Sequence, residues 1–512
     1  MKHFARCWLA LLLLPVPFAH AQAPVEPPPA APAAPPANDV LSVFERGRLA
    51  LRAGDYVAAG EAMDTLLRRE DFARLDSRLQ YRTLLFAGLA AAGREDFLSA
   101  HEWMMVATEY DEAGDYQWLL RARYATTIDA LPDAALALMK IAERWPAKLV
   151  EDDDRRELVD QVIFRLQHDP ARHADYLSLA NALFAAKYTG ELDAQPDGLW
   201  SDLILEALAH QDLARARELV GRVETPGTIL AMRIDKRFDA LVQADKKRFD
   251  LAVAMRRTSK ELEKRMSAEP KRLAVVVQYL YALQDQGRFR EVLSVSGAAL
   301  KKIAAAPAES PAYDDLDRSL NWLYNHRARA FAHVGRWDDA VATMETGSRQ
   351  VEHGSDNVSQ AINLAAQYND AGRPRQALDA LGGIDWAVSL SPYGRMQFQA
   401  VRYDAYLLLG DAAAAEQTLA YLREHHEDAE NTWQYVMLES GDEDGAAAGL
   451  IARLKDTELR GEALKTVQIY PDSPRTPRMQ AEHDRWQKLI ARADVRAAID
   501  QVGRVEKVPM YD

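Results

Sequence analysis

Apolar residues recur at helical spacing along most of this chain. Between Asn321 and Val334 they fall at Trp322, Tyr324, Ala328 and Phe331, in the three- and four-residue steps that place side chains on one helix face. Comparable spacing predicts helices over 119–131, 134–145, 156–166, 175–186, 249–266 and 478–502. The β-rich string 275–280 continues in the same spacing to Leu283, so we read it as helix. The pattern therefore predicts an all-α protein.

A recurring turn separates these helices. It occurs at Gly54-Asp55-Tyr56, Gly287-Arg288-Phe289, Gly335-Arg336-Trp337 and Gly372-Arg373-Pro374, with weaker copies at Gly410 and Gly441. Glycine ends helices because it adopts the left-handed conformation without steric cost. Gly335, Gly372 and Gly410 are 37 and 38 residues apart, a period typical of an α-solenoid. Gly93-Arg94 is expected to begin another copy, with Phe97 and Ala100 displaced by an insertion.

One unit shows the pattern most completely. Tyr324, Ala328, Phe331, the turn at Gly335 with Trp337, and Ala340 give an aromatic, a small residue, an aromatic, a glycine-led turn and an alanine, in that order. In this order the unit resembles the tetratricopeptide repeat. The further positions that match are Gly47, Gly54, Tyr56 and Ala59, then Ala365, Tyr368, Gly372 and Ala377, then Tyr406, Gly410 and Ala415.

Three positions depart from that pattern. Val43 replaces the opening aromatic, Pro374 replaces the turn aromatic, and Tyr403 occupies a small-residue place. The match covers 39–70 and 311–425. The resemblance implies an α-solenoid of antiparallel helix pairs that binds protein partners. Similar proteins serve in cell-envelope assembly and polysaccharide export.

The first residues are typical of a secretory signal peptide. A positive start with Lys2 and Arg6 precedes a short apolar run and a small-x-small site that ends at Ala21. We expect cleavage near Ala21 and a periplasmic or secreted protein. Residues 22–38, almost entirely Pro and Ala, favour extended conformations and predict a disordered linker.

The rest of the chain divides by pattern into four parts. Residues 39–190 predict an N-terminal repeat block, and 191–306 a middle helical region with a long charged helix. Residues 307–470 predict C-terminal repeats of the tetratricopeptide type. Residues 471–512 predict a Pro-rich loop and one final helix that caps the last apolar face.

Charge and cysteine content exclude several functions. Without the signal peptide the formal net charge is −16, which repels phosphate backbones, so we expect no nucleic-acid partner. The one cysteine, Cys7, lies inside the signal, so no disulfide or thiolate site is expected beyond it. No apolar stretch reaches the ~20 residues of a transmembrane anchor.

Catalytic, cofactor and metal motifs are missing. The sequence has no G-x-S-x-G elbow, no H-E-x-x-H helix and no phosphate-binding glycine loop. His425-His426 is read as a solvated turn, because adjacent histidines on a helix point about 100° apart. The acidic run 151–154 is read as a first helical turn. We therefore expect no catalytic residues, cofactor or metal site.

The tryptophans leave an alternative open. Trp322 and Trp337 are expected in the core, while Trp386 and Trp433 are less constrained. Aromatic rings in a groove bind sugars, so a carbohydrate- or small-ligand-binding repeat protein is the second hypothesis. An unrecognised cell-wall-active enzyme is the third. The leading hypothesis is an exported scaffold for protein–protein interactions.

Overall fold

The computed structural model describes residues 39–190, 194–307, 309–350 and 357–511. The expected signal peptide and linker lie outside the described residues. Within the described ranges the secondary-structure elements are helices. Two isolated β-bridges pair Asp235 with Gly503 and Ile469 with Lys507. The all-α prediction is confirmed.

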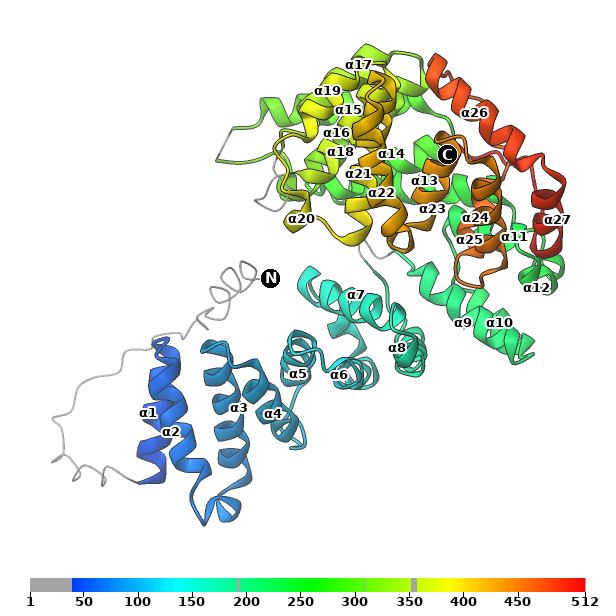
Figure 1. Cartoon of the computed structure of the whole chain (residues 1–512). Coiled ribbons are helices and arrows are strands. Elements are labelled where there is room, and N and C mark those ends of the chain that lie inside the picture. Colours follow the sequence, from blue (N-terminus) through cyan, green and yellow to red (C-terminus); the bar gives the residue numbers. More distant parts are fainter. Residues whose placement is uncertain (1–38, 191–193, 308, 351–356, 512) are drawn as a thin grey trace. The chain divides into compact units, whose positions relative to one another are not determined.

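The chain forms two compact units, residues 1–203 and 204–512. In unit 1, consecutive helices pack in sequence order, as Figure 1 shows. Its helices are α1 (Val40–Arg52), α2 (Tyr56–Leu67), α3 (Ser77–Gly93), α4 (Phe97–Ala107), α5 (Asp115–Thr127), α6 (Leu131–Arg144), α7 (Asp153–Gln167) and α8 (His173–Ala185). Helix α9 (Asp197–Ala209) spans the boundary between the units.

Unit 2 continues the helix pairs. Its first part contains α10 (Leu213–Val220), α11 (Pro226–Ile234), α12 (Asp239–Ala244), α13 (Leu251–Ala268), α14 (Leu273–Asp285), α15 (Phe289–Ala305), α16 (Leu316–His333) and α17 (Trp337–Gly347). Then follow α18 (Val358–Asp370), α19 (Pro374–Leu381), α20 (Trp386–Ser389), α21 (Pro392–Leu409), α22 (Ala412–Glu424), α23 (Glu430–Glu439), α24 (Glu443–Lys455) and α25 (Arg460–Thr466). Two last helices, α26 (Pro477–Ile490) and α27 (Ala493–Val502), complete it.

Within the described residues, nine turns inside helix pairs share one geometry. At each of these turns, a residue with positive φ follows the first helix. The next residue donates its N–H to the carbonyl five positions back, and this bond satisfies a carbonyl of the last helical turn that would otherwise lack a partner. Asp55 N–H bonds Ala50 O at 2.9 Å and Arg336 N–H bonds Phe331 O at 2.9 Å. Six glycines occupy the positive-φ position: Gly54, Gly287, Gly335, Gly372, Gly410 and Gly441.

Three further turns use the same geometry without glycine. Glu95, Asp129 and Gln211 have φ of 62°, 65° and 59° at the equivalent position. The expectation of an insertion after Gly93-Arg94 is therefore wrong. Gly93 is the last residue of α3, and Phe97 follows Glu95 at the same interval as Tyr56 follows Gly54. The repeat thus extends through the segment where the sequence looked irregular.

Small residues let the two helices of a pair approach closely. A Cβ added at Gly47 would lie 2.1 Å from Met63 Cε, and one at Gly88 would lie 2.3 Å from Met104 Cε. Ala59 and Ala100 face these positions from the second helices, and both are fully buried. Because α3 and α4 repeat the contacts of α1 and α2, the same packing rule governs both pairs.

The helices of unit 2 close into a ring. Helix α11, which lies near the beginning of the unit, packs against α25, which lies near the end of the unit. Figure 1 shows the two helices side by side. Gly503 lies in this junction, where an added Cβ would be 2.5 Å from Ile234 O and 2.5 Å from Leu464 Cδ2. Arg233 pairs with Glu506 at 2.5 Å. Closure therefore depends on residues after the last helix.

The C-terminal segment differs from the single capping helix that the pattern predicted over 478–502. The helix breaks at Ala491, which caps α26, and Arg492 caps α27. Helix α27 buries Val495 and Ile499 and packs on α24. Helix α26 buries only Leu489 and Ile490, both at its end. The break separates a mostly polar helix from an apolar one.

Candidate binding face

The sequence-predicted packing residues lie in three kinds of place. Gly54, Gly335, Gly372 and Gly410 form the turns with positive φ. Tyr56, Tyr324, Trp337 and Tyr406 are half-buried. The remaining nine are buried between helices: Gly47, Ala59, Ala328, Phe331, Ala340, Ala365, Tyr368, Ala377 and Ala415. Tyr403, which departs from the pattern by occupying a small-residue place, is buried as well. These residues hold the pairs together, so a binding surface must be sought elsewhere on the helices.

Such a surface is formed by the first helices of successive pairs in unit 2. Near their C-terminal ends, α14, α16, α18, α21 and α23 present polar side chains to residues 471–511 of the same unit. We call this surface the array face and define it by Asp285, His333, Asp370, Asp404, Tyr435 and Glu439. A sequence search could not find it, because these residues share no motif and meet only when the pairs stack.

Arg478 of α26 is the centre of the contact. Its Nη2 lies 2.8 Å from Asp404 Oδ2 and 2.9 Å from Glu482 Oε1, and its Nε lies 3.8 Å from Asp370 Oδ1. Tyr435 Oη accepts from Arg478 Nη2 at 2.9 Å and lies within hydrogen-bond reach of Asp404 Oδ2 (3.0 Å) and Glu482 Oε1 (2.7 Å). One guanidinium therefore joins α18, α21 and α23.

Burial shapes the electrostatics of this cluster. The side chains of Arg478 and Asp404 are 14% and 10% exposed. Burial raises the pKa of Asp404 to about 7 against the opposing effect of Arg478, and burial with the charge of Glu482 raises the pKa of Asp370 to about 7. Arg478 opposes the effect of burial at both carboxyls, so its removal would raise their pKa values further and favour the protonated forms.

Further basic residues of the C-terminal segment continue the contact. Arg485 Nη2 pairs with Glu439 Oε1 at 2.5 Å, and the Glu439 side chain is 7% exposed. Lys488 pairs with Glu443 at 2.7 Å, and Arg492 with Asp444 at 2.7 Å, both at the start of α24. Positive charges on the C-terminal segment thus meet negative charges on the repeats.

The two ends of residues 471–511 contact the part of the array face that lies on α14 and α16. Ser473 Oγ lies 3.0 Å from His333 Nδ1. The Tyr511 N–H donates to Asp285 O at 3.0 Å, and its ring meets Phe289 edge-on with centroids 5.0 Å apart. Burial and Arg329 lower the pKa of His333 to about 4, so the imidazole is neutral near pH 7.

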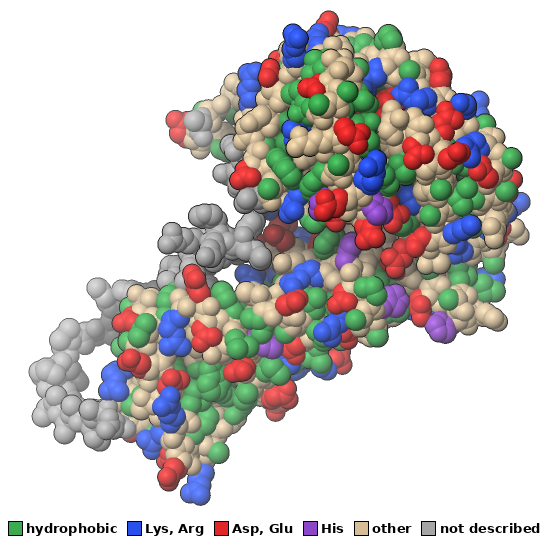
Figure 2. Space-filling view, in the orientation of Figure 1, with side chains coloured by type: hydrophobic (Ala, Val, Ile, Leu, Met, Phe, Trp, Pro, Cys, Tyr) green, Lys and Arg blue, Asp and Glu red, His purple; other side chains and the backbone are tan. Residues whose placement is uncertain are grey.

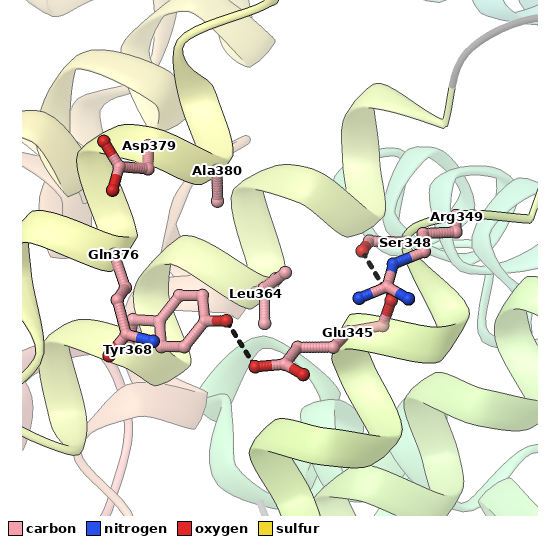
Figure 3. Close-up of a pocket in the computed structure, with 8 residues that line it drawn as sticks. All are labelled: Glu345, Ser348, Arg349, Leu364, Tyr368, Gln376, Asp379 and Ala380. Atoms are coloured by element: carbon pink, nitrogen blue, oxygen red, sulfur yellow. Dashed lines mark hydrogen bonds between the residues drawn. The ribbon is translucent and has the colours of Figure 1, made fainter.

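A separate pocket of about 330 Å³ lies where α17, α18 and α19 meet. Figure 3 shows Tyr368 directed at Glu345, with its hydroxyl donating to the carboxylate at 2.5 Å. Burial and this carboxylate raise the pKa of Tyr368 to about 12. Ser348, Arg349, Gln376 and Asp379 complete the polar lining of the pocket. The Tyr368–Glu345 bond joins adjacent repeats.

Other sequence-derived candidates take structural places. Asp152 caps α7 with its side chain, and Asp153 and Asp154 lie in the first turn, which confirms that reading of the acidic run. The His425 ring stacks on Tyr421 at 4.2 Å. Within the described ranges, no three His, Cys, Asp or Glu side chains are grouped to hold a metal, and no helix is long and apolar enough to cross a membrane.

The expectation for Trp322 is wrong. The residue is 38% exposed and so lies outside the core. Trp386 packs beside Phe398 and Tyr421, at 6.1 and 5.3 Å between centroids.

In unit 1, α4 exposes Leu98, Met105 and Val106, and Figure 2 shows hydrophobic side chains gathered over α3 and α4.

The helix pairs, their shared turn and their close packing define this chain as an α-solenoid with repeats of the tetratricopeptide type. No protein-family model matches it, and no curated protein matches its sequence.

Solved structures give alignments of low identity. The P58(IPK) TPR domain is 13% identical and covers 82% of this chain and 100% of its own, with a TM-score of 0.20. Yeast Tom70 is 12% identical over 90% and 99%, with a TM-score of 0.24. Cut9–Hcn1 of the APC/C is 10% identical over 91% and 96%, with a TM-score of 0.28. These scores carry no argument about function.

Proposed function

We propose that this chain is an exported, periplasmic scaffold that binds segments of partner proteins on the array face of unit 2. The observation that carries the proposal is that this face already holds a helix, α26, through a buried ion-pair cluster centred on Arg478. A surface built to hold one helix by its charged side chains is suited to another of the same chemistry.

Export is supported by the pattern of residues 1–21, which has a positive start, a short apolar run and a small-x-small site. The proposed setting is cell-envelope assembly, including polysaccharide export, as the resemblance to repeat proteins with those roles suggests. The proposed role is binding and no turnover.

In-cell cross-linking tests the binding role. A photo-reactive amino acid replaces Tyr281 of α14, which is 51% exposed, and the control position is Leu213 of α10, 39% exposed. We expect one or two envelope proteins to be captured from position 281 and not from 213. Equal capture from both positions, or none from folded protein, would reject the scaffold role. N-terminal sequencing of the same protein, from the periplasmic fraction, tests cleavage after Ala21.

Carbohydrate binding is the second candidate, favoured by exposed aromatic rings on neighbouring helices. Trp322 is 38% exposed and Tyr281 is 51% exposed, with the Tyr281 ring 5.9 Å from that of His326, one turn beyond Trp322. Quenching of tryptophan fluorescence by oligosaccharides, abolished in Trp322→Ala, would support it over the protein-binding role.

A further inference from the structure

Helix α26 is held on the array face by charge more than by apolar packing. Of its residues only Leu489 and Ile490 are buried, whereas Arg478 and Arg485 pair with largely buried carboxylates. The neighbouring α27 buries Val495, Ala498 and Ile499 and so anchors the segment to α24. At the other end, Pro471, Pro474 and Pro477 interrupt the chain. The middle of the segment is therefore held mainly by ion pairs, whereas α27 is held by apolar packing.

The basic residues of the segment follow a regular spacing. Arg478 and Arg485 of α26 are seven residues apart, which places them along one side of the helix about 10 Å from one another. Their partners lie on the first helices of successive pairs, Asp404 on α21 and Glu439 on α23. Arg492 lies beyond the break at Ala491, where it precedes α27 and pairs with Asp444 of α24. The spacing of the arginines matches the spacing of the stacked pairs.

The face also favours a positively charged side chain. Asp404 and Glu439 are only 10% and 7% exposed in the side chain, so water compensates little of their charge and a paired cation stabilises them. Around Arg478, oxygens of Asp404 and Tyr435 from the face, and of Glu482 from α26 itself, lie within hydrogen-bond distance of Nη2, while Asp370 Oδ1 lies 3.8 Å from Nε.

Building on the proposed function, we propose that α26 is an internal mimic of the partner: the partner is a basic helix with two arginines seven residues apart, and it displaces α26 from the array face. A second copy of the chain, contributing its own α26, is the alternative occupant that the test separates.

The probe is a fluorescent peptide of residues 476–493 of this chain, titrated into the full-length protein. We expect weak binding to the wild type and at least tenfold tighter binding to Arg478→Gln/Arg485→Gln, in which the internal helix is loosened. Arg496→Gln, an exposed residue of α27, makes the same charge change and should bind like the wild type. A control peptide with Arg485 and Gln487 exchanged keeps the composition but turns the central arginine about 200° around the helix. This control peptide should bind at least tenfold more weakly than the peptide of the natural sequence.

Arg485→Gln alone covers the case in which the double variant does not fold, because Arg485 is 36% exposed and bonds only one carboxylate outside α26. It should raise peptide affinity at least threefold. Equal affinities of folded wild type, Arg485→Gln and Arg496→Gln would overturn the proposal. A wild-type dimer that the peptide dissociates would assign the face to a second copy and overturn it too. Capture of an envelope protein in cells without peptide binding would keep the scaffold role and reject this inference.

Discussion

The chain end of unit 2 packs against one turn glycine, Gly287, and this contact can be tested with a single methyl group. Gly287 has φ +68°, and a Cβ there would lie 2.3 Å from Tyr511 Cε2 and 2.9 Å from its Cδ2 and Cζ. Gly372 has φ +71° in the same turn, with nothing within 4 Å of an added Cβ. The two glycines therefore share their backbone requirement and differ only in the ring.

The magnitudes separate accordingly. In Gly372→Ala the left-handed conformation should lower the free energy of unfolding by about 1 kcal/mol. In Gly287→Ala the Tyr511 ring must also leave its edge-on contacts with Phe289 and His333, at 5.0 and 6.1 Å between centroids. Aromatic pairs contribute about 0.5–1.5 kcal/mol each, so the total loss should be about 2–4 kcal/mol.

Urea unfolding of the full chain, followed by circular dichroism, measures both losses, and hydrogen exchange at Tyr511 reports whether the chain end has undocked. The decisive comparison uses a Tyr511→Ala background. There Gly287→Ala should cost the same ~1 kcal/mol as Gly372→Ala, because the ring is already gone. If Gly287→Ala and Gly372→Ala cost the same with Tyr511 present, the docking of the ring contributes nothing and our account of the chain end is wrong.

Three further perturbations follow from the same structure. Glu95→Gly should raise the free energy of unfolding by about 0.5–1 kcal/mol, because Glu95 has φ 62°, while the mid-helix control Glu102→Gly should lower it by about 1 kcal/mol in urea unfolding. Gly503→Ala should destabilise unit 2 by about 1–3 kcal/mol and speed hydrogen exchange in α11 and α25, since the methyl would meet Ile234 O at 2.5 Å; unchanged exchange there would contradict ring closure at this point. Burial and Arg329 lower the pKa of His326 to about 4 in the folded protein. Between about pH 6.5 and pH 4 the imidazole is therefore protonated in the unfolded chain but not in the folded one, and the free energy of unfolding decreases as the pH is lowered through that window. The stability advantage of the wild type over His326→Gln should then shrink by about 2–3 kcal/mol from pH 7 to pH 4, and a constant difference would refute the assigned pKa.

The sequence was sufficient for the fold class and for the turns marked by glycine, because glycine signals positive φ directly. It was insufficient at Glu95, Asp129 and Gln211, where packing of the pair imposes the same conformation and no glycine signals it. Trp322 was misplaced for a related reason. Apolar character at helical spacing identifies a face, but only the stacked neighbours decide whether that face is covered.

The array face could not be predicted from residue patterns for a deeper reason. Asp370, Asp404 and Glu439 each look like an ordinary polar residue near the end of an amphipathic helix, and Arg478 follows a proline in what reads as a terminal cap. Their meaning arises from the translation between repeats, which brings the three carboxylates into one row, and from ring closure, which returns residues 471–511 to that row. A helix held there must carry its charges at the interval set by the stacking of the pairs. The repeat geometry that is legible in glycines and alanines thus also determines which partner helix the surface fits.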